Sequence, residues 1–245
     1  MKKWIVFGAA FVAIAIAERK RPLRARTAAE WPRLRSNFAM AGLTAAVTAA
    51  LQKPLVDRAF TDRGLLSRLP RPLRFLAGIL LLDYTLWWWH RANHVVPALW
   101  RFHVVHHLDR DLDVSTALRF HFGEMALAAV FRAAQVRVLG VDRDALGWWQ
   151  TMLLISILFH HSNIDLGSDA DGQLMRFLVT PRMHGIHHAD VFELTNSNWS
   201  SLFTWWDMLH RTFIYRVPQA SITIGAPGRD EDLPLGRLLA APFTA

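Results

Sequence analysis

Residues 90–107, HRANHVVPALWRFHVVHH, hold the first two of three histidine boxes that decide how this chain folds. The first box has H-x-x-x-H spacing and the second H-x-x-H-H, so each places its imidazoles on one face of a helix. Residues 184–188, HGIHH, repeat the second spacing. Imidazole is the commonest metal ligand, and packing offers no reason for three such boxes, so they predict a metal site. The eight residues are His90, His94, His103, His106, His107, His184, His187 and His188.

Further candidate ligands stand outside the three boxes. His121 stands alone before Glu124, and His160 and His161 end an apolar stretch. The chain has no cysteine, which excludes cysteine zinc sites, iron–sulfur clusters and thiol catalysis. Imidazole suits zinc, copper, iron and nickel, so the ligand type does not choose the metal. About ten imidazoles are enough for two ions with four or five ligands each.

The charge distribution favours a membrane protein over a nucleic-acid-binding protein. The net charge is +8, and the basic run 18–35 lies between two apolar stretches. No zinc-finger spacing and no RNA-recognition motif accompanies it, and a basic segment beside an apolar helix is expected on the cytoplasmic side. The 57–74 loop is also basic, which weakens this orientation. Five apolar stretches are candidate membrane segments: 4–17, 36–52, 75–89, 125–141 and 145–159.

None of these stretches reaches the roughly 20 apolar residues of a usual span, so the spans must tilt, extend into polar ends or form a re-entrant pair. With 18–35 in the cytoplasm, the second stretch leads out and the third leads back, which places His90 at the cytoplasmic surface. The last two stretches fit a hairpin turning at 141–144, with His121 and His161 near one face. Residues 15–17, AIA, could end a cleaved signal peptide, but the basic run that follows favours a retained helix.

Six motifs follow one another between Asp83 and Thr212: HRANH, FHVVHH, LRFHFGE, FHHSN, TPRMHGIHH and NWSSLFTWWDMLHRT. In this order they resemble the fatty acid hydroxylase/sterol desaturase superfamily, which comprises integral-membrane, non-haem di-iron oxidases. The tail sequences ITIGAP and LLAAPF resemble those of bacterial members. The resemblance implies two iron ions, with zinc as a misloaded metal, and O2 as co-substrate. The ligands it implies are His90, His94, His103, His106, His107, His121, His161 rather than His160, His184, His187 and His188.

The sequence and the resemblance together predict an all-α fold, an integral-membrane helical bundle with a cytoplasmic helical cap that carries the histidine boxes. Residues 1–216 are expected to form one domain whose histidine-box core is 83–212. Residues 217–245, rich in proline and glycine, are expected to form an irregular tail. The Arg-over-Lys bias and the short chain favour a bacterial inner membrane.

Several other polar and aromatic residues have expected roles. Asp83 precedes His90 by two helical turns, and we expect it to accept a ring N–H from a metal ligand and so orient that ring. Asn163 and Asn198 either do the same or cap helices. Asp207 is expected to anchor the terminal segment to an arginine. The tryptophans at 87–89 and 205–206 are expected to form a belt at the membrane–water interface. The alternative is that they line a substrate channel.

Two positions depart from the superfamily motif. His210 stands where the motif usually has an aromatic residue, and Arg211 stands where it usually has glycine.

The resemblance implies hydroxylation or desaturation of a lipid at an unactivated C–H bond, the lipid being a fatty acyl, sterol, hopanoid or related molecule. The sequence has no Gly-rich dinucleotide fingerprint, so we expect an external electron donor, a ferredoxin or a cytochrome b5-like protein with its reductase. We expect no nucleic-acid partner. The alternative function is a histidine-rich membrane metal transporter or metal-binding protein without oxidase activity, whose ligands should line a path across the membrane.

Overall fold

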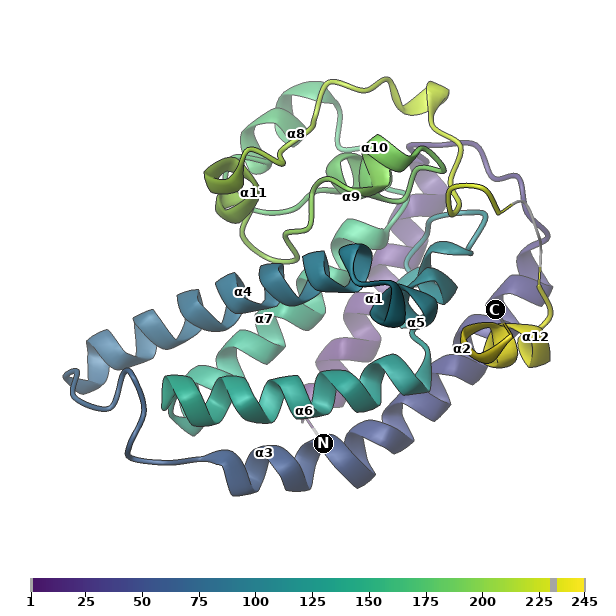
Figure 1. Cartoon of the computed structure of the whole chain (residues 1–245). Coiled ribbons are helices and arrows are strands. Elements are labelled where there is room, and N and C mark those ends of the chain that lie inside the picture. The colour runs from purple at the N-terminus through teal and green to yellow at the C-terminus, as the bar shows by residue number, and fades with distance from the viewer. Residues whose placement is uncertain (1, 230–232, 245) are drawn as a thin grey trace.

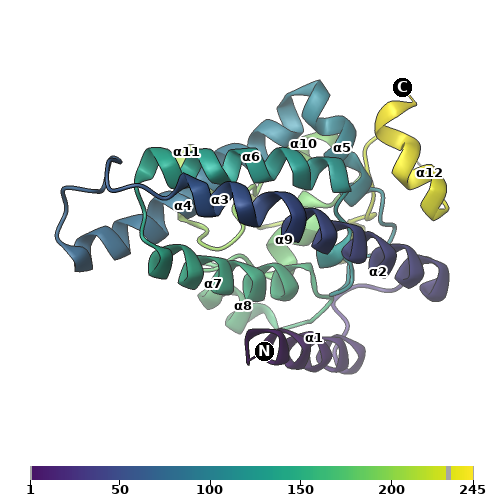
Figure 2. The same cartoon turned by 90° about the horizontal axis from the view of Figure 1, so that it is seen from below.

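The computed structural model describes residues 2–229 and 233–244. Over that part the chain is helical, with isolated β-bridges and no strand, which confirms the all-α prediction. Four long helical segments lie alongside one another (Figures 1 and 2). They are α2 (Glu30–Val47) with its continuation, α4 (Arg71–Val95), α6 (Phe122–Leu139) and α7 (Arg143–His161).

The segment α2 continues through a π-helical turn, η1 (Thr48–Gln52), into α3 (Lys53–Ala59). Pro54 has no N–H to donate to the carbonyl of Ala50, and the helix widens at this place. Glu30–Ala59 is the one helix in the described part of the chain that is long and apolar enough to cross a membrane. The other four expected membrane segments therefore remain predictions.

The hairpin of α6 and α7 turns at 140–142, next to the predicted 141–144. Gly140 ends α6 with φ 66°, a left-handed conformation that favours glycine. Asp142 begins α7, because its side chain accepts a hydrogen bond from the Ala145 N–H at 2.7 Å. The hairpin packs against α4 around the buried side chains of Leu82, Val136 and Trp149. This turn sends the start of α6 and the end of α7 to the same end of the bundle.

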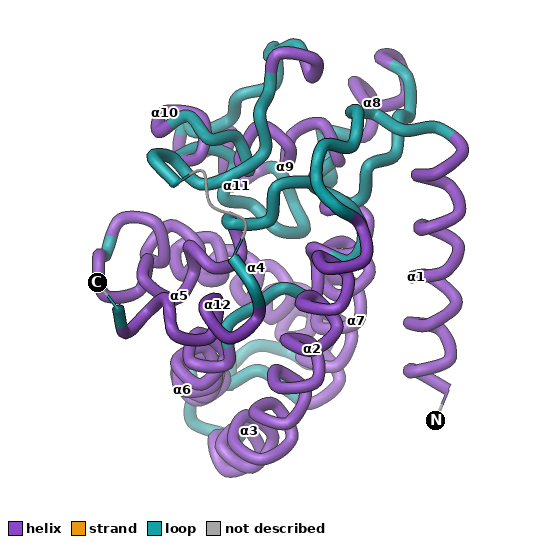
Figure 3. The backbone as a smooth tube through the Cα atoms, turned by 90° about the vertical axis from the view of Figure 1, so that its right-hand side faces the viewer, coloured by secondary structure: helices purple, strands orange, loops and turns teal. Residues whose placement is uncertain are grey.

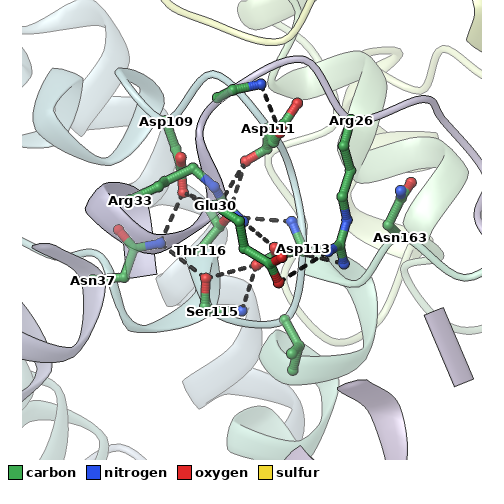
Figure 4. A network of polar contacts seen from close by, with 12 residues as sticks. Arg26, Glu30, Arg33, Asn37, Asp109, Asp111, Asp113, Ser115, Thr116 and Asn163 are labelled. Atoms are coloured by element: carbon green, nitrogen blue, oxygen red, sulfur yellow. Dashed lines mark hydrogen bonds and ion pairs between the residues drawn. The ribbon is translucent and has the colours of Figure 1, made fainter. Parts of the chain in front are cut away.

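Helix α1 (Lys2–Lys20) stands at one side of the molecule and packs on α7 (Figure 3). Residues 18–33 run from the end of α1 into the start of α2. They are tied to the loop 108–115, which follows the second histidine box (Figure 4). Arg33 forms ion pairs with Asp109, at 2.9 Å, and with Asp113. The Glu18 carboxylate accepts hydrogen bonds from two backbone N–H groups, and burial raises its pKa to about 7. The network thus joins α1, α2 and this loop.

Four short helices, α8 to α11, form a cap over the C-terminal ends of α4 and α7 (Figure 1). Asp207 fastens it, accepting hydrogen bonds from Trp87 Nε1 at 2.9 Å, from Thr212 Oγ1 at 2.7 Å and from two backbone N–H groups. The cap helices are α8 (Ser168–Leu174), α9 (Pro181–His187), α10 (Phe192–Thr195) and α11 (Trp205–His210). Helix α5 (Pro97–His107) and the 3-10 turn η2 (Thr116–Leu118) connect α4 to α6.

The tail is more regular than its composition predicts. It contains η3 (Gln219–Ser221), α12 (Leu235–Ala240) and η4 (Ala241–Phe243). Leu238 is fully buried against Met40 and the second histidine-box helix, and that burial explains why a glycine- and proline-rich segment forms a helix there. Residues 230–232 and 245 of the tail lie outside the described residues.

Candidate metal centre

Nine of the ten expected ligands lie in two adjoining groups among the described residues, and within each group one ring nitrogen of every histidine lies within 4.8 Å of the others. The first group draws on α4, α5 and α9. The second draws on α5, on the end of α7, and on α9 with the residue after it. The first group is His90, His94, His103, His107 and His187, and the second is His106, His161, His184 and His188.

In the second group, ring nitrogens meet without a proton between them. The Nδ1 of His161 lies 2.8 Å from the Ile157 carbonyl, and the Nδ1 of His106 lies 3.1 Å from the Arg119 carbonyl. A carbonyl only accepts, so both Nδ1 atoms carry the proton of a neutral ring. The two Nε2 lone pairs then face each other at 3.0 Å. Such an arrangement is stable when a cation lies between them.

His184 and His188 complete the second group. The Nε2 of His184 lies 2.9 Å from that of His161 and 3.1 Å from that of His188. Nitrogens bound to one tetrahedral ion at about 2.0–2.1 Å lie roughly 3.4 Å apart, close to these separations. The four nitrogens therefore have the spacing of a single ion's ligands.

The first group has buried ring nitrogens that lack partners among the described residues: both nitrogens of His94 and His107, and the Nε2 of His103 and His187. The rings meet closely, with centroids 4.6 Å apart for His90 and His187 and 4.9 Å apart for His94 and His107. Buried polar atoms normally have a partner, and a metal ion would supply one to all of these nitrogens.

Burial keeps the imidazoles in the neutral form that binds metal. Desolvation lowers the pKa of His187 to about 3, although the Ser197 carbonyl opposes this change by accepting its ring N–H. Burial first, and the neighbouring histidines second, lower the pKa of His107 and His188 well below the ordinary value. At neutral pH each of these three rings therefore offers a lone pair.

Outer hydrogen bonds orient the rings. The Trp199 carbonyl accepts from His90 Nδ1 at 2.7 Å, and the Ser197 carbonyl accepts from His187 Nδ1 at 2.7 Å. Glu124 Oε1 lies 2.9 Å from His103 Nδ1, and both side chains are buried. A carboxylate in this position fixes the ring and raises the basicity of the nitrogen that faces the metal.

The structure does not bring His121 to either group. Its Nδ1 accepts from the Gly123 N–H at 3.0 Å, which begins α6, and its Nε2 lies 3.1 Å from the Leu239 carbonyl. The ring contacts Phe102, Phe122 and Phe243 and touches no histidine in the described part of the chain. Both of its nitrogens thus have partners within the protein, and its place here is structural.

His160 lies beside the second group, whereas His161 lies within it. The His160 ring centroid is 4.2 Å from that of His184, and the ring hydrogen-bonds to the backbone of Ser201. The geometry therefore agrees with the choice of His161 over His160.

Asp83, expected to orient a ligand ring, contacts other groups in the structure. It accepts hydrogen bonds from Trp206 Nε1 at 2.7 Å, Trp149 Nε1 at 3.4 Å and the Phe203 N–H at 3.2 Å, with no histidine among its described partners. It therefore ties the cap to the bundle. The carboxylate that lies beside a histidine of the two groups is Glu124, and the sequence signal that could have found it is the R-x-H-x-x-E motif.

The two asparagines hold backbone segments. Asn163 Oδ1 accepts from the Arg24 N–H at 2.9 Å, and its Nδ2 donates to the Arg24 carbonyl at 2.8 Å. Asn198 donates to the Met183 and Ile214 carbonyls at 3.1 and 2.7 Å. Neither contacts a ligand ring in the described structure, so both act on the segments that carry the rings. Asp207, expected to pair with an arginine, bonds instead to the tryptophan, threonine and backbone donors given above.

The two departures from the motif have structural explanations. The His210 ring stacks on Trp87 with centroids 4.1 Å apart and its Nε2 lies 3.1 Å from Tyr84 Oη, so it fills the place of an aromatic ring. Arg211 has φ 59°, the conformation that favours glycine. Of the expected tryptophan belt, Trp87 is buried, while Trp88 and Trp205 are exposed.

Sequence comparisons identify relatives. A family model described as fatty acid hydroxylase matches residues 75–212. The ornithine lipid hydroxylase OlsE of Rhizobium tropici is 29% identical over 175 residues, which are 71% of this chain and 52% of that protein. The alkylglycerol monooxygenases of Homo sapiens and Xenopus tropicalis are 27% and 28% identical over 142 and 143 residues, 58% of this chain and 31% of each of those proteins.

The chain spans about half the length of the first of these relatives and less of the others. No solved structure matches it. The family match covers more than half of the chain and contains all three histidine boxes, so the chain belongs to the fatty acid hydroxylase family.

Proposed function

We propose that the chain is a membrane-bound, non-haem di-iron oxidoreductase that uses O2 and external electrons to oxidise a lipid at an unactivated C–H bond. The observation that carries the proposal is the second histidine group, in which proton-free Nε2 atoms face one another at 3.0 Å. Nine ligands in groups of five and four fit two ions that share one buried site.

Two bound irons would supply the reduction of O2 and the oxidation of the C–H bond. The protein's own contribution is to hold the nine rings in place and to keep buried rings such as His107, His187 and His188 neutral. Burial keeps His187 unprotonated, and Glu124 and the backbone carbonyls hold ring N–H groups away from the ions. The proposed ligand set is therefore His90, His94, His103, His106, His107, His161, His184, His187 and His188, without His121.

The names of the relatives favour hydroxylation over desaturation. One relative is an ornithine lipid hydroxylase and the others are alkylglycerol monooxygenases. Both names describe insertion of oxygen into a lipid-derived molecule, so we infer a polar lipid as the substrate class for this chain.

We further infer that the bundle is embedded in a membrane and that this is a bacterial inner membrane. The metal centre is proposed to lie at the cytoplasmic end of the bundle. What supports this inference is the apolar outer surface of the long helices, because a water-soluble protein rarely exposes so many large apolar side chains along one set of helices. The exposed residues include Ile5, Val12, Ile16, Phe38, Leu43, Leu76, Leu80, Val130, Trp148 and Ile155.

Electrons are proposed to come from a ferredoxin or a cytochrome b5-like protein with its reductase. The purified protein should then be inactive with O2 and NAD(P)H alone and become active when a ferredoxin and its reductase are added. Activity without a donor protein would contradict this part of the proposal.

Metal transport is the alternative. A transporter is expected to spread its ligands along a path, whereas all nine rings lie in two adjoining groups drawn from the C-terminal parts of α4, α5 and α7 and from α9 with the residue after it. The position of the rings therefore supports an oxidase rather than a transport path.

The test is the metal content of detergent-purified protein together with a Mössbauer spectrum after growth with iron-57. We expect two irons per chain in a coupled pair, and label from ¹⁸O2 in a hydroxylated lipid. His188→Ala should lose iron, while His160→Ala, a matched buried histidine beside the site, should lose less. Zinc alone calls for reconstitution with iron, since overexpression misloads such sites. One metal or none after reconstitution would contradict the di-iron proposal.

A further inference from the structure

Arg91 lies directly after a proposed ligand and its charge is not neutralised. Its guanidinium carbon is 5.7 Å from the centre of the Trp88 ring and 5.5 Å from that of Trp199. Within the described residues it forms no ion pair and no hydrogen bond, and it is partly exposed. Asp207, which accepts a hydrogen bond from the Trp199 backbone N–H, also accepts from three further donors. Arg91 is therefore a cation in reach of an anionic ligand.

One exposed apolar side chain, Trp88, lies next to this cation, and α11, which meets α4 here, carries two more. Trp88 is 43% exposed, and its ring lies 5.2 Å from that of His210, so α11 meets α4 at this point. On α11, Met208 is 40% exposed and Leu209 is 64% exposed. We call Arg91, Trp88, Met208 and Leu209 the α4–α11 surface. An apolar area beside a guanidinium matches a lipid with an anionic headgroup, whose chain and charge are both accommodated.

The α4–α11 surface adjoins the metal centre. The Trp199 ring, on which Arg91 lies, belongs to the residue whose carbonyl holds His90 Nδ1 at 2.7 Å. His90 and His94 are the two members of the nine-histidine set that keep exposed surface, while the other seven are buried. These two partly exposed histidines lie one residue before and three residues after Arg91 on α4.

We propose that the α4–α11 surface binds the lipid substrate, with Arg91 pairing with a phosphate or carboxylate of the headgroup and Trp88, Met208 and Leu209 carrying the start of the chain. The guanidinium fork donates two parallel hydrogen bonds to such a group. Arg91 is then a residue that selects lipids with a phosphate or carboxylate headgroup over uncharged lipids. This inference deepens the proposed function and rests on it.

The test measures binding of two chain-labelled dansyl lipids to the metal-loaded protein in detergent: phosphatidylglycerol, which has a phosphate headgroup, and diacylglycerol, which has neither phosphate nor carboxylate. Arg91→Gln should weaken binding of the anionic lipid roughly tenfold and leave the uncharged lipid unchanged. Arg91→Lys keeps the positive charge but not the planar guanidinium, so its affinity for the anionic lipid should lie between those of the unchanged protein and Arg91→Gln. Leu209→Asn should weaken both lipids. Arg101→Gln, the loss of another exposed arginine, is the matched control and should change neither.

Four outcomes would overturn the proposal. Equal weakening of both lipids by Arg91→Gln would assign it a structural role, and equal effects of Arg91→Gln and Arg101→Gln would mean unspecific attraction. Displacement of the anionic lipid by inorganic phosphate, with Leu209→Asn without effect, would identify a soluble anion as the ligand. Iron content and hydroxylation are measured on the same samples. Intact iron and activity with no lipid selectivity would refute this inference alone, whereas absent iron would refute the proposed function.

Discussion

Glu124 shows how one side chain outside the metal ligands controls the site. Its buried carboxylate lies 2.9 Å from His103 Nδ1 and so decides which nitrogen of that ring faces the other histidines. Most other oriented rings are held by backbone carbonyls, which a substitution cannot remove. A substitution at Glu124 can therefore change the orientation of a ring, whereas a substitution elsewhere leaves a backbone carbonyl in place.

Glu124→Ala should reduce the affinity for metal about 10- to 100-fold, because His103 loses the acceptor that fixes its tautomer. Glu124→Gln should lose less, since its amide oxygen still accepts the ring N–H. The measurement is iron retained after dialysis against a chelator, with Glu193→Gln, a change at an exposed acid of α10, as control. Unchanged retention in Glu124→Ala would show that the ring needs no carboxylate.

Arg211 is a residue in a backbone conformation that suits glycine. Its φ of 59° disfavours any side chain with a Cβ atom, so Arg211→Gly should raise the free energy of unfolding by about 1 kcal/mol. Thermal unfolding in detergent measures this. Arg216→Gly, which removes the same charge where φ is not positive, should give no gain. A gain in both variants would mean that lost charge repulsion, and not backbone strain, is responsible.

At the scale of single elements, α9 shows why a seven-residue helix can carry two proposed metal ligands, with a third directly after it. Thr180 begins it by accepting from the Met183 N–H at 3.4 Å, and Pro181 fits its first turn. The buried Arg24 donates to the Pro181 carbonyl at 3.4 Å and to Gln219 Oε1 at 2.5 Å, and so lies flat on the helix. Tertiary contacts, and not helix propensity, hold so short a helix in place.

Gly185→Ala should reduce iron content. An added Cβ would overlap the Arg24 guanidinium and lie 2.9 Å from its Cζ, and Arg24 is buried and has little room to move. Shortening the arginine in the double variant Arg24→Ala with Gly185→Ala should recover part of the iron. Gly42→Ala, where no atom lies within 4 Å of an added Cβ, is the control and should keep all of it. Full iron content in Gly185→Ala would show that α9 shifts freely.

At the scale of the whole molecule, the centre exists because separate parts of the chain converge at one end of the bundle. The ion pairs of Arg33 hold the loop after α5 to α2, and the Asp83 and Asp207 contacts hold the cap to α4. The cost of this assembly is the burial of many imidazoles.

That burial predicts a pH dependence of the metal-free protein. Burial lowers the pKa of His161 and His187 to about 3, against 6.5 in the unfolded chain. Each histidine's contribution is therefore fully present above pH 6.5 and lost as the pH falls towards 3, by about 1.4 kcal/mol per pH unit for each ring. Unfolding by guanidinium after chelation, from pH 7.5 to 5, measures the loss. Constant stability over that range would contradict neutral buried rings.

The sequence by itself determined the helical class, the three boxes, the family and nearly all of the ligand candidates. It could do so because spacings of three and four residues fix which side chains share a helix face, a local property that needs no knowledge of the fold. The α6–α7 turn followed in the same way from local signals.

Only the tertiary structure decided how the rings are divided. His106 and His107 are neighbours in sequence, yet they enter different groups, because adjacent residues of a helix point about 100° apart and meet different partners. His121 is outside both groups because its two nitrogens bond to Gly123 and Leu239, the latter more than a hundred residues away. Two of the three partners of Asp83, Phe203 and Trp206, lie as far along the chain. Such pairings depend on how distant segments pack, which no local spacing encodes.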